Sequence, residues 1–147
     1  MLVLTFQVDQ ISYAVPVKQV IEIVPRVALR QVPHTPPYFL GLLHYRGSAL
    51  SVIDLGLLLG RAACQDRLDT RILIVRSAHD GQSMGLLAER VNELVDVDAA
   101  RMAMASPLLL SAPYLTEVYE TESGLLQLID PARIAVSAAT ELEGTDL

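Results

Sequence analysis

Residues 41–55 read GLLHYRGSALSVIDL, and this stretch is typical of a β-hairpin followed by a helical turn. Two largely apolar runs, residues 42–46 and 49–53, are separated by Gly47-Ser48. A two-residue connection that contains glycine favours a tight turn between antiparallel strands. We therefore predict a hairpin that turns at Gly47-Ser48, and one apolar turn over residues 55–59 that Gly60 closes.

The residues before this hairpin predict further short strands. Residues 2–8 alternate between apolar and polar side chains, which indicates a half-buried strand, and residues 11–15 continue the alternation after a turn at Asp9-Gln10. Residues 17–24 predict a short helical turn that passes into a strand before Pro25, and the proline-rich residues 33–41 predict a loop. The side chains expected on the buried face of the first strand are Leu2, Leu4, Phe6 and Val8.

The second half of the chain repeats this pattern of strands and turns. Strands are predicted over residues 70–76, 83–89 and 91–97, with a turn at Asp80-Gly81 and a bulge or close approach at Gly85. Residues 98–113 are expected to be irregular. A last hairpin of residues 114–119 and 125–129 leads to Asp130-Pro131, which predicts the start of a short helix that includes residues 133–139.

Many short strands separated by turn residues predict an all-β fold, either barrels or a sandwich. Residues 61–69, RAACQDRLD, form the best internal linker and favour two small sub-barrels joined near this point. We expect residues 1–147 to form a single domain and residues 140–147 to be a flexible acidic tail.

The charge distribution argues against a nucleic-acid partner. The chain has a formal net charge of -6; residues 1–88 carry 8 basic and 6 acidic side chains, and residues 89–147 carry 3 and 11. No basic cluster that could neutralise phosphates is present in the sequence. No apolar run approaches the ~20 residues that span a bilayer, and the first residues lack the basic start of a signal peptide, so we expect no direct membrane insertion.

The sequence offers little that could support catalysis or bind a metal ion. The three histidines, His34, His44 and His79, lack metal-ligand spacing, and Cys64 is the only cysteine, so we expect neither a metal site nor a cofactor. The nearest catalytic grouping is His44 with Asp54 and Ser48 or Ser51, without a nucleophile-elbow sequence around either serine. A small-molecule-binding or hydrolytic barrel that uses His44 and Asp54 remains the alternative hypothesis, and we expect a protein that is not an enzyme.

Five blocks of the chain resemble, in order and spacing, the CheW family of chemosensory coupling proteins. Residues 41–55 are similar to its pattern of Gly-hydrophobic-x-Asn-Leu-Arg-Gly followed by a strand that ends in Ile-Asp-Leu. The other blocks are YAVPVKQVIEIVP (13–25), RILIV (71–75), MGLLAERVNELVDV (84–97) and YLTEVYETESGLLQLIDPARI (114–134). The resemblance implies two five-stranded SH3-like β-barrels packed over a shared apolar interface.

The resemblance also implies a function and a site. Its members are cytoplasmic adaptors that join the tips of methyl-accepting chemoreceptors to the regulatory domain of a CheA-type histidine kinase at membrane-associated receptor arrays. The residues that match receptor-binding or kinase-binding positions of the family are Val20, Glu22, Arg46 and Val91. His44 and Tyr45 replace the usual Asn-Leu, and Gly56 stands where many members carry a polar residue, departures that bear on the identity of the partner more than on the fold.

A receptor tip is a helical hairpin, so a site for it is expected to be an apolar groove that accepts one face of a helix. Val20 and Val91 would line such a groove, and Arg46 would fix the register by pairing with a carboxylate or a backbone carbonyl. Two plainer interpretations stay open. Both valines are ordinary core residues, or Arg46 forms a salt bridge inside the domain with Glu22.

Overall fold

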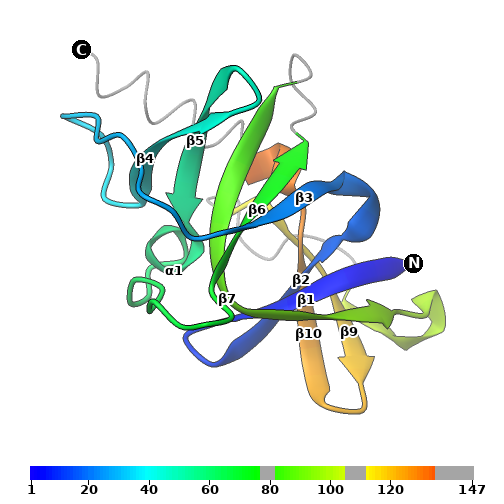
Figure 1. The fold of residues 1–147 in the computed structure, drawn as a ribbon. Helices are drawn as coiled ribbons and strands as arrows, with labels where there is room; N and C mark the ends of the chain where they lie inside the picture. Colours follow the sequence, from blue (N-terminus) through cyan, green and yellow to red (C-terminus); the bar gives the residue numbers. More distant parts are fainter. Residues whose placement is uncertain (77–81, 105–111, 135–147) are drawn as a thin grey trace.

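Ten β-strands contain most of the residues that the computed structural model describes, which are 1–76, 82–104 and 112–134 (Figure 1). Helical structure in these ranges is limited to the 3₁₀ turns η1 (Val17–Gln19) and η2 (Ala99–Arg101), the helix α1 (Leu55–Leu58) and a turn over residues 131–134. The predicted all-β class is therefore confirmed. The strands are β1 (Leu2–Val8), β2 (Ile11–Pro16), β3 (Val20–Pro25), β4 (Phe39–Tyr45), β5 (Ser48–Asp54), β6 (Arg71–Arg76), β7 (Ser83–Asp96), β8 (Met102–Met104), β9 (Leu115–Thr121) and β10 (Gly124–Ile129).

The first hairpin, β1 with β2, matches the prediction except at Leu2. Asp9 and Gln10 form its turn with φ of 49° and 67°, which suits the right-handed twist of the paired strands. Leu2 is 47% exposed, whereas Val3 is fully buried. The expected burial of Leu2 was wrong because Leu2 lies beyond the central cluster that contains Leu4, whereas Val3 packs into a separate cluster on the opposite face.

The β4–β5 hairpin is longer than predicted, and its turn begins one residue earlier. Tyr45 pairs with Ser48, so Arg46 and Gly47 are the two turn residues, with φ of 49° and 80°. The predicted turn at Gly47-Ser48 was therefore wrong. A two-residue turn of this kind needs positive φ at both positions, and the glycine takes the second of them.

β7 is one strand of 14 residues where the sequence predicts two. It bends at Arg90, which has a φ of 50°. Residues before the bend pair with β6 and, in parallel, with β5, and residues after it pair with β1. The predicted close approach at Gly85 is confirmed, because a Cβ there would lie 2.9 Å from Ile72 Cγ2 and 3.0 Å from Val52 Cγ2.

The strands fall into two groups that share β7. One group contains β1, β2, β8, β9 and β10, and the other contains β3, β4, β5 and β6. Residues 61–69 connect β5 to β6 within the second group, so the linker lies inside one half and β7 is the strand that passes between the halves. The closure of each group into a barrel stays a prediction.

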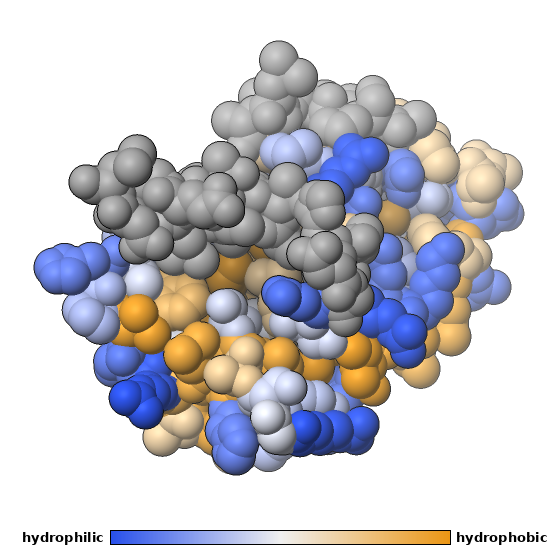
Figure 2. All heavy atoms as spheres, turned by 90° about the horizontal axis from the view of Figure 1, so that it is seen from above, coloured by the Kyte–Doolittle hydropathy of each residue, from blue (hydrophilic) through white to orange (hydrophobic). Residues whose placement is uncertain are grey.

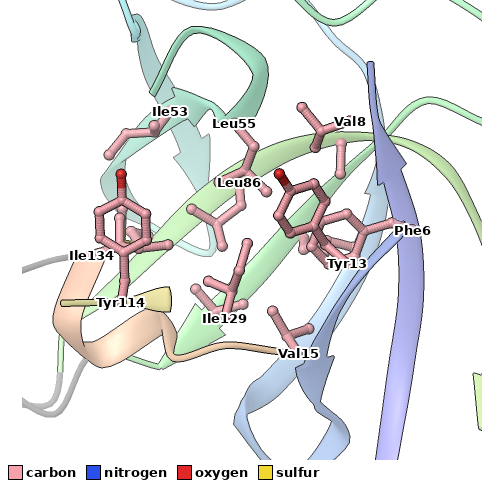
Figure 3. Packing of buried hydrophobic residues seen from close by; sticks show 14 of the residues in the cluster. Phe6, Val8, Tyr13, Val15, Ile53, Leu55, Leu86, Tyr114, Ile129 and Ile134 are labelled. Carbon is pink, nitrogen blue, oxygen red and sulfur yellow. The ribbon is translucent and has the colours of Figure 1, made fainter. Parts of the chain in front are cut away.

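Three apolar clusters hold these groups together. The largest, here called the central cluster, draws side chains from both groups, and Figure 3 shows Phe6, Tyr13 and Ile129 converging with Ile53, Leu55 and Leu86. A second cluster lies within the β3–β6 group and the first part of β7. A third lies among β1, β2, β9 and β10. Because both groups contribute side chains to the central cluster, the cluster agrees with the shared apolar interface that the resemblance implies.

The remaining predictions have mixed outcomes. Residues 98–113 were expected to be irregular but include η2 and β8. Glu89 is only 8% exposed, and Arg67 Nε pairs with its Oε2 at 3.2 Å, which offsets the cost of burying the charge. Asp130 begins the predicted helical turn, with Oδ1 accepting from Ala132 N at 3.1 Å. The turn at Asp80-Gly81, the helix beyond residue 134 and the tail 140–147 lie outside the described residues.

No helix in the described ranges is long and apolar enough to cross a membrane. Hydrophobic side chains nevertheless reach the surface: on the face shown in Figure 2 they form a broken band among hydrophilic residues. Eight large hydrophobic residues are exposed in the part of the chain that the structure describes, namely Met1, Leu2, Ile11, Ile23, Val27, Leu68, Leu94 and Leu125.

Candidate protein-interaction site

Two of the four predicted site residues meet at the tip of the β4–β5 hairpin. Arg46 Nη2 lies 2.8 Å from Oε1 of Glu22, which β3 carries to the same place. The side chains are 71% and 40% exposed, so solvent screens the pair and it stabilises the fold by about 1 kcal/mol or less. Such a pair is available to another protein because separating it costs little.

Tyr45 completes this group, which we call the turn triad (Glu22, Tyr45 and Arg46). Its hydroxyl donates to Glu22 Oε1 at 2.6 Å, and the Arg46 guanidinium lies over its ring, 5.1 Å from the centroid. The hydrogen bond to Glu22 raises the pKa of Tyr45, since the carboxylate favours the protonated phenol; burial adds to this, and the Arg46 charge opposes it. Glu22 is therefore held by two donors on one oxygen.

Val20 lies two residues before Glu22 but belongs to the other face of the sheet. Val20 pairs with Val75 and Glu22 with Ile74, so an irregularity of one residue separates them. Paired residues of antiparallel strands share a face, and Val75 lies in the central cluster whereas Ile74 lies in the second cluster. Val20 is only partly buried and packs at the border of the central cluster.

Val91, the fourth predicted residue, is a core residue by burial. It is 9% exposed, belongs to the central cluster and follows directly after the bend at Arg90. Its backbone N–H donates to Asp69 O at 3.1 Å, which fixes β7 against the end of the 61–69 segment. The structure thus places Arg46 beside Glu22 at the hairpin tip, and it places Val20 and Val91 at the central cluster. The four residues do not form one groove.

The sequence analysis did not identify Tyr45 as a member of the site. The available signal was an aromatic residue with a hydroxyl directly before the turn arginine, where the resembling family has leucine. In a hairpin with a two-residue turn, the residue before the turn is the last to pair with the opposite strand. Its side chain is therefore held in place by the sheet while the arginine beside it stays exposed.

The alternative site at His44 and Asp54 is not assembled. His44 is exposed and pairs with Ala49 next to the turn, whereas Asp54 ends β5 at the far end of the hairpin. Asp54 is 1% exposed, and its carboxylate accepts from the backbone N–H groups of Gly56 (2.8 Å), Leu57 (3.3 Å) and Cys64 (3.1 Å). Asp54 thus caps α1 and ties the 61–69 segment to it.

The described residues also contain no group of three or more His, Cys, Asp or Glu side chains that could hold a metal ion. Cys64 is buried, and its Sγ donates to Leu87 O at 3.4 Å. Burial, with a smaller contribution from Asp54, raises its pKa to about 12, so the thiol is protonated and unreactive near neutral pH.

The strand groups, the shared central cluster and the turn triad define a small all-β domain with an exposed, weakly held ion pair at a hairpin tip. The family model described as CheW-like domain matches residues 2–139, and the chain belongs to this family. The solved structure of the scaffolding protein TtCheW from Thermoanaerobacter tengcongensis superposes with a TM-score of 0.77, at 25% identity over 87% of each chain.

Curated relatives agree with this assignment. The chain is 35% identical to "Chemotaxis protein CheW" of Helicobacter pylori over 92 residues, which cover 63% of this chain and 54% of that protein. It is 28% identical to the Rhizobium meliloti protein of the same name over 64% of this chain and 59% of that protein. With "Chemotaxis protein CheW" of Bacillus subtilis it shares 26% identity over 86% of this chain and 81% of that protein. The match thus spans little more than half the length of the first two relatives.

Proposed function

We propose that this protein is a non-catalytic adaptor that couples methyl-accepting chemoreceptors to a CheA-type histidine kinase. The observation that carries the proposal is the match to the CheW-like domain over residues 2–139, since relatives in this family are named chemotaxis proteins and a solved one is a scaffolding protein. Such an adaptor acts in the cytoplasm, at receptor arrays on the membrane, through protein contacts alone.

The turn triad is the part of the surface best suited to one of these contacts. An exposed guanidinium can exchange its partner, and Arg46 would leave Glu22 Oε1 for a carboxylate or a backbone carbonyl of the receptor or the kinase. Tyr45 would keep Glu22 in place during that exchange, because its hydroxyl remains bonded. Complementary charge of this kind contributes mainly to specificity and register.

The valines have a different role in the proposal. Val20 is at the border of the central cluster and is partly accessible, so it would supply apolar contact on the opposite face of β3 from the triad. Val91 is buried, so it would not contact a partner directly and would instead fix the bend of β7.

The test is reconstitution of receptor-containing membranes, the kinase and this protein, with co-sedimentation and kinase activity as readouts. Arg46→Glu is expected to weaken co-sedimentation by about tenfold or more, which corresponds to the loss of one charge-assisted contact. Arg76→Glu is the matched control, since Arg76 is an exposed arginine at a strand end without an ion pair among the described residues. Unchanged thermal unfolding in both variants separates binding from folding.

The charge swap Glu22→Arg with Arg46→Glu sharpens the test. It restores the internal ion pair but reverses the charge that a partner meets. If the swap binds like the original protein, the triad is a structural feature only. If Arg46→Glu itself assembles and activates the kinase normally, the assignment of Arg46 to the binding site is wrong.

A further inference from the structure

Within the part of the chain that the structure describes, the second part of β7 has an unpaired edge. After the bend at Arg90, its only strand partner among the described residues is β1. Met1 and Val97 exchange two hydrogen bonds, of 2.9 and 3.0 Å, so they form a hydrogen-bonded pair of the antiparallel ladder. Such pairs alternate, so Val95 and Glu93 also face β1, while the N–H and C=O groups of Leu94 and Asp96 point away from it.

A hollow of about 720 Å³ lies against this strand, on the face that carries Glu93 and Val95. Val95, Val97 and Leu126 provide apolar lining. The charged side chains around it are mostly acidic: Glu93, Asp96, Asp98, Glu120 and Glu122, against Arg90 and Arg101. Of these five acidic residues, Asp96 has an ion-pair partner among the described residues, the amino terminus at 3.0 Å.

The opposite face of the same strand is exposed and carries leucines beside Asp96. Leu94 pairs with Leu4 and is 62% exposed, and Leu2, one pair further along β1, is also exposed. Diagonal neighbours on one face of a sheet are close enough for leucine side chains to form one surface. The edge at Leu94–Asp96 is thus bordered by the acidic hollow on one face and, on the other, by Leu94 and Leu2, with Asp96 as the pair partner of Leu2.

We propose that this edge binds an extended, basic segment of a partner protein, which adds as a strand beside residues 94–96 of β7. Successive side chains of an added strand point to opposite faces, so a segment in which basic and apolar residues alternate would place its cations over the acidic hollow and its apolar groups on Leu94 and Leu2. Charge complementarity favours a basic segment, because a second copy of this chain would bring its own acidic residues against the acidic residues around the hollow. The inference concerns a surface separate from the turn triad and does not depend on it.

Charged residues also protect edge strands from aggregation, and that role alone would account for Glu93 and Asp96. It does not account for Leu94, whose exposed side chain on the same edge favours association. The acidic residues together with the exposed Leu94 therefore disfavour pairing with an acidic strand and favour pairing with a basic one.

The probe is a capped, fluorescently labelled peptide in which valine and lysine alternate over about seven residues, titrated with the full chain at low salt. Saturable binding that weakens with added salt is expected, and the same peptide with glutamate for lysine is expected not to bind. Two further peptides carry N-methyl groups on alternate residues. In one peptide they block the first hydrogen-bonding edge of the strand, and in the other peptide they block the second edge. Methylation of one edge is expected to abolish binding and methylation of the other to leave it, because only one edge would pair with β7.

Leu94→Pro tests the edge from the side of the protein. The N–H of Leu94 faces away from β1, so proline removes this donor without removing a ladder bond to β1. Binding of the lysine peptide is expected to fall about tenfold or more. Leu94→Thr is the matched control, because it also loses the leucine side chain but keeps the N–H, and it is expected to bind the peptide more tightly than Leu94→Pro. Equal binding of the lysine and glutamate peptides, or of both methylated peptides, would overturn the proposal even if Leu94→Pro fails to fold.

Discussion

The hydroxyl of Tyr45 lies 2.6 Å from Glu22 Oε1, and the neighbouring Arg46 uses the same oxygen at 2.8 Å. Two strands that are not paired with each other, β3 and β4, are thereby connected at their surface by one carboxylate. Glu22 is therefore oriented before any partner arrives, and Arg46 can be displaced from it without leaving Oε1 unbonded.

Loss of the carboxylate is expected to change the titration of Tyr45. The Glu22→Ala variant removes the hydrogen bond that raises the pKa of Tyr45 and leaves the Arg46 charge, which lowers it. The pKa of Tyr45 is expected to fall, as measured by NMR of ring-labelled tyrosine with Tyr45→Phe for assignment. Glu93→Ala is the control, because Glu93 does not contribute to the pKa of this phenol. An unchanged titration curve in Glu22→Ala would contradict the hydrogen bond.

Cys64 is expected to make the protein sensitive to alkali. Burial raises the pKa of its thiol from 9.0 to about 12, so above pH 9 the unfolded chain loses the proton first and binds fewer protons than the folded chain. The free energy of unfolding that is fully present below pH 9 is therefore lost progressively as the pH rises towards 12. Urea unfolding at several pH values should show a shallower alkaline decline in Cys64→Ala. Equal slopes for the two proteins would count against this prediction.

Asp54 is expected to be among the most costly polar residues to replace. Asp54→Ala leaves three backbone N–H groups, two buried and one partly buried, without their acceptor and is expected to lower the free energy of unfolding by about 2–4 kcal/mol. Asp98→Ala is the matched control, since Asp98 caps η2 through one exposed bond to Ala100 N and is expected to cost about 1 kcal/mol or less. Urea unfolding of both variants measures the difference, and similar losses would show that Asp54 is an ordinary cap.

Gly41 is expected to tolerate no side chain. It has a φ of +146°, and a Cβ there would lie 2.5 Å from the backbone oxygen of Arg30, which accepts from Leu42 N. Gly41→Ala is expected to cost about 3 kcal/mol and to lower the melting temperature. Gly124→Ala separates strain from contact, because Gly124 has a φ of +118° with open space around it. Equal losses in the two variants would mean that backbone strain alone decides.

The strands and the family resemblance were predictable because they depend on local patterns. Alternation identified β1 and β2, and an aspartate before a proline identified the helical turn after β10. The turn of the β4–β5 hairpin was misplaced by one residue because its geometry requires Arg46 to adopt a positive φ. Residues other than glycine, asparagine and aspartate rarely adopt a positive φ.

The predicted site residues do not all lie together because their positions depend on long-range register. An irregularity of one residue between Val20 and Glu22 reverses which face each side chain occupies, and sequence spacing does not reveal it. The ion pair between Glu22 and Arg46 was foreseen as one possibility, since both residues were already candidates. Burial of Val91 depends on the bend at Arg90, and the sequence analysis divided β7 into two strands at that point.

The strand β7 has a mechanical consequence. Because one continuous backbone belongs to both halves, a displacement of one half is transmitted to the other through the bend at Arg90, in addition to the β2–β3 connection and the central cluster. Neither half can be exchanged for that of another protein by a simple splice, since any crossover would leave an incomplete sheet on both sides. The two halves are therefore expected to move as one body and not as two independent units.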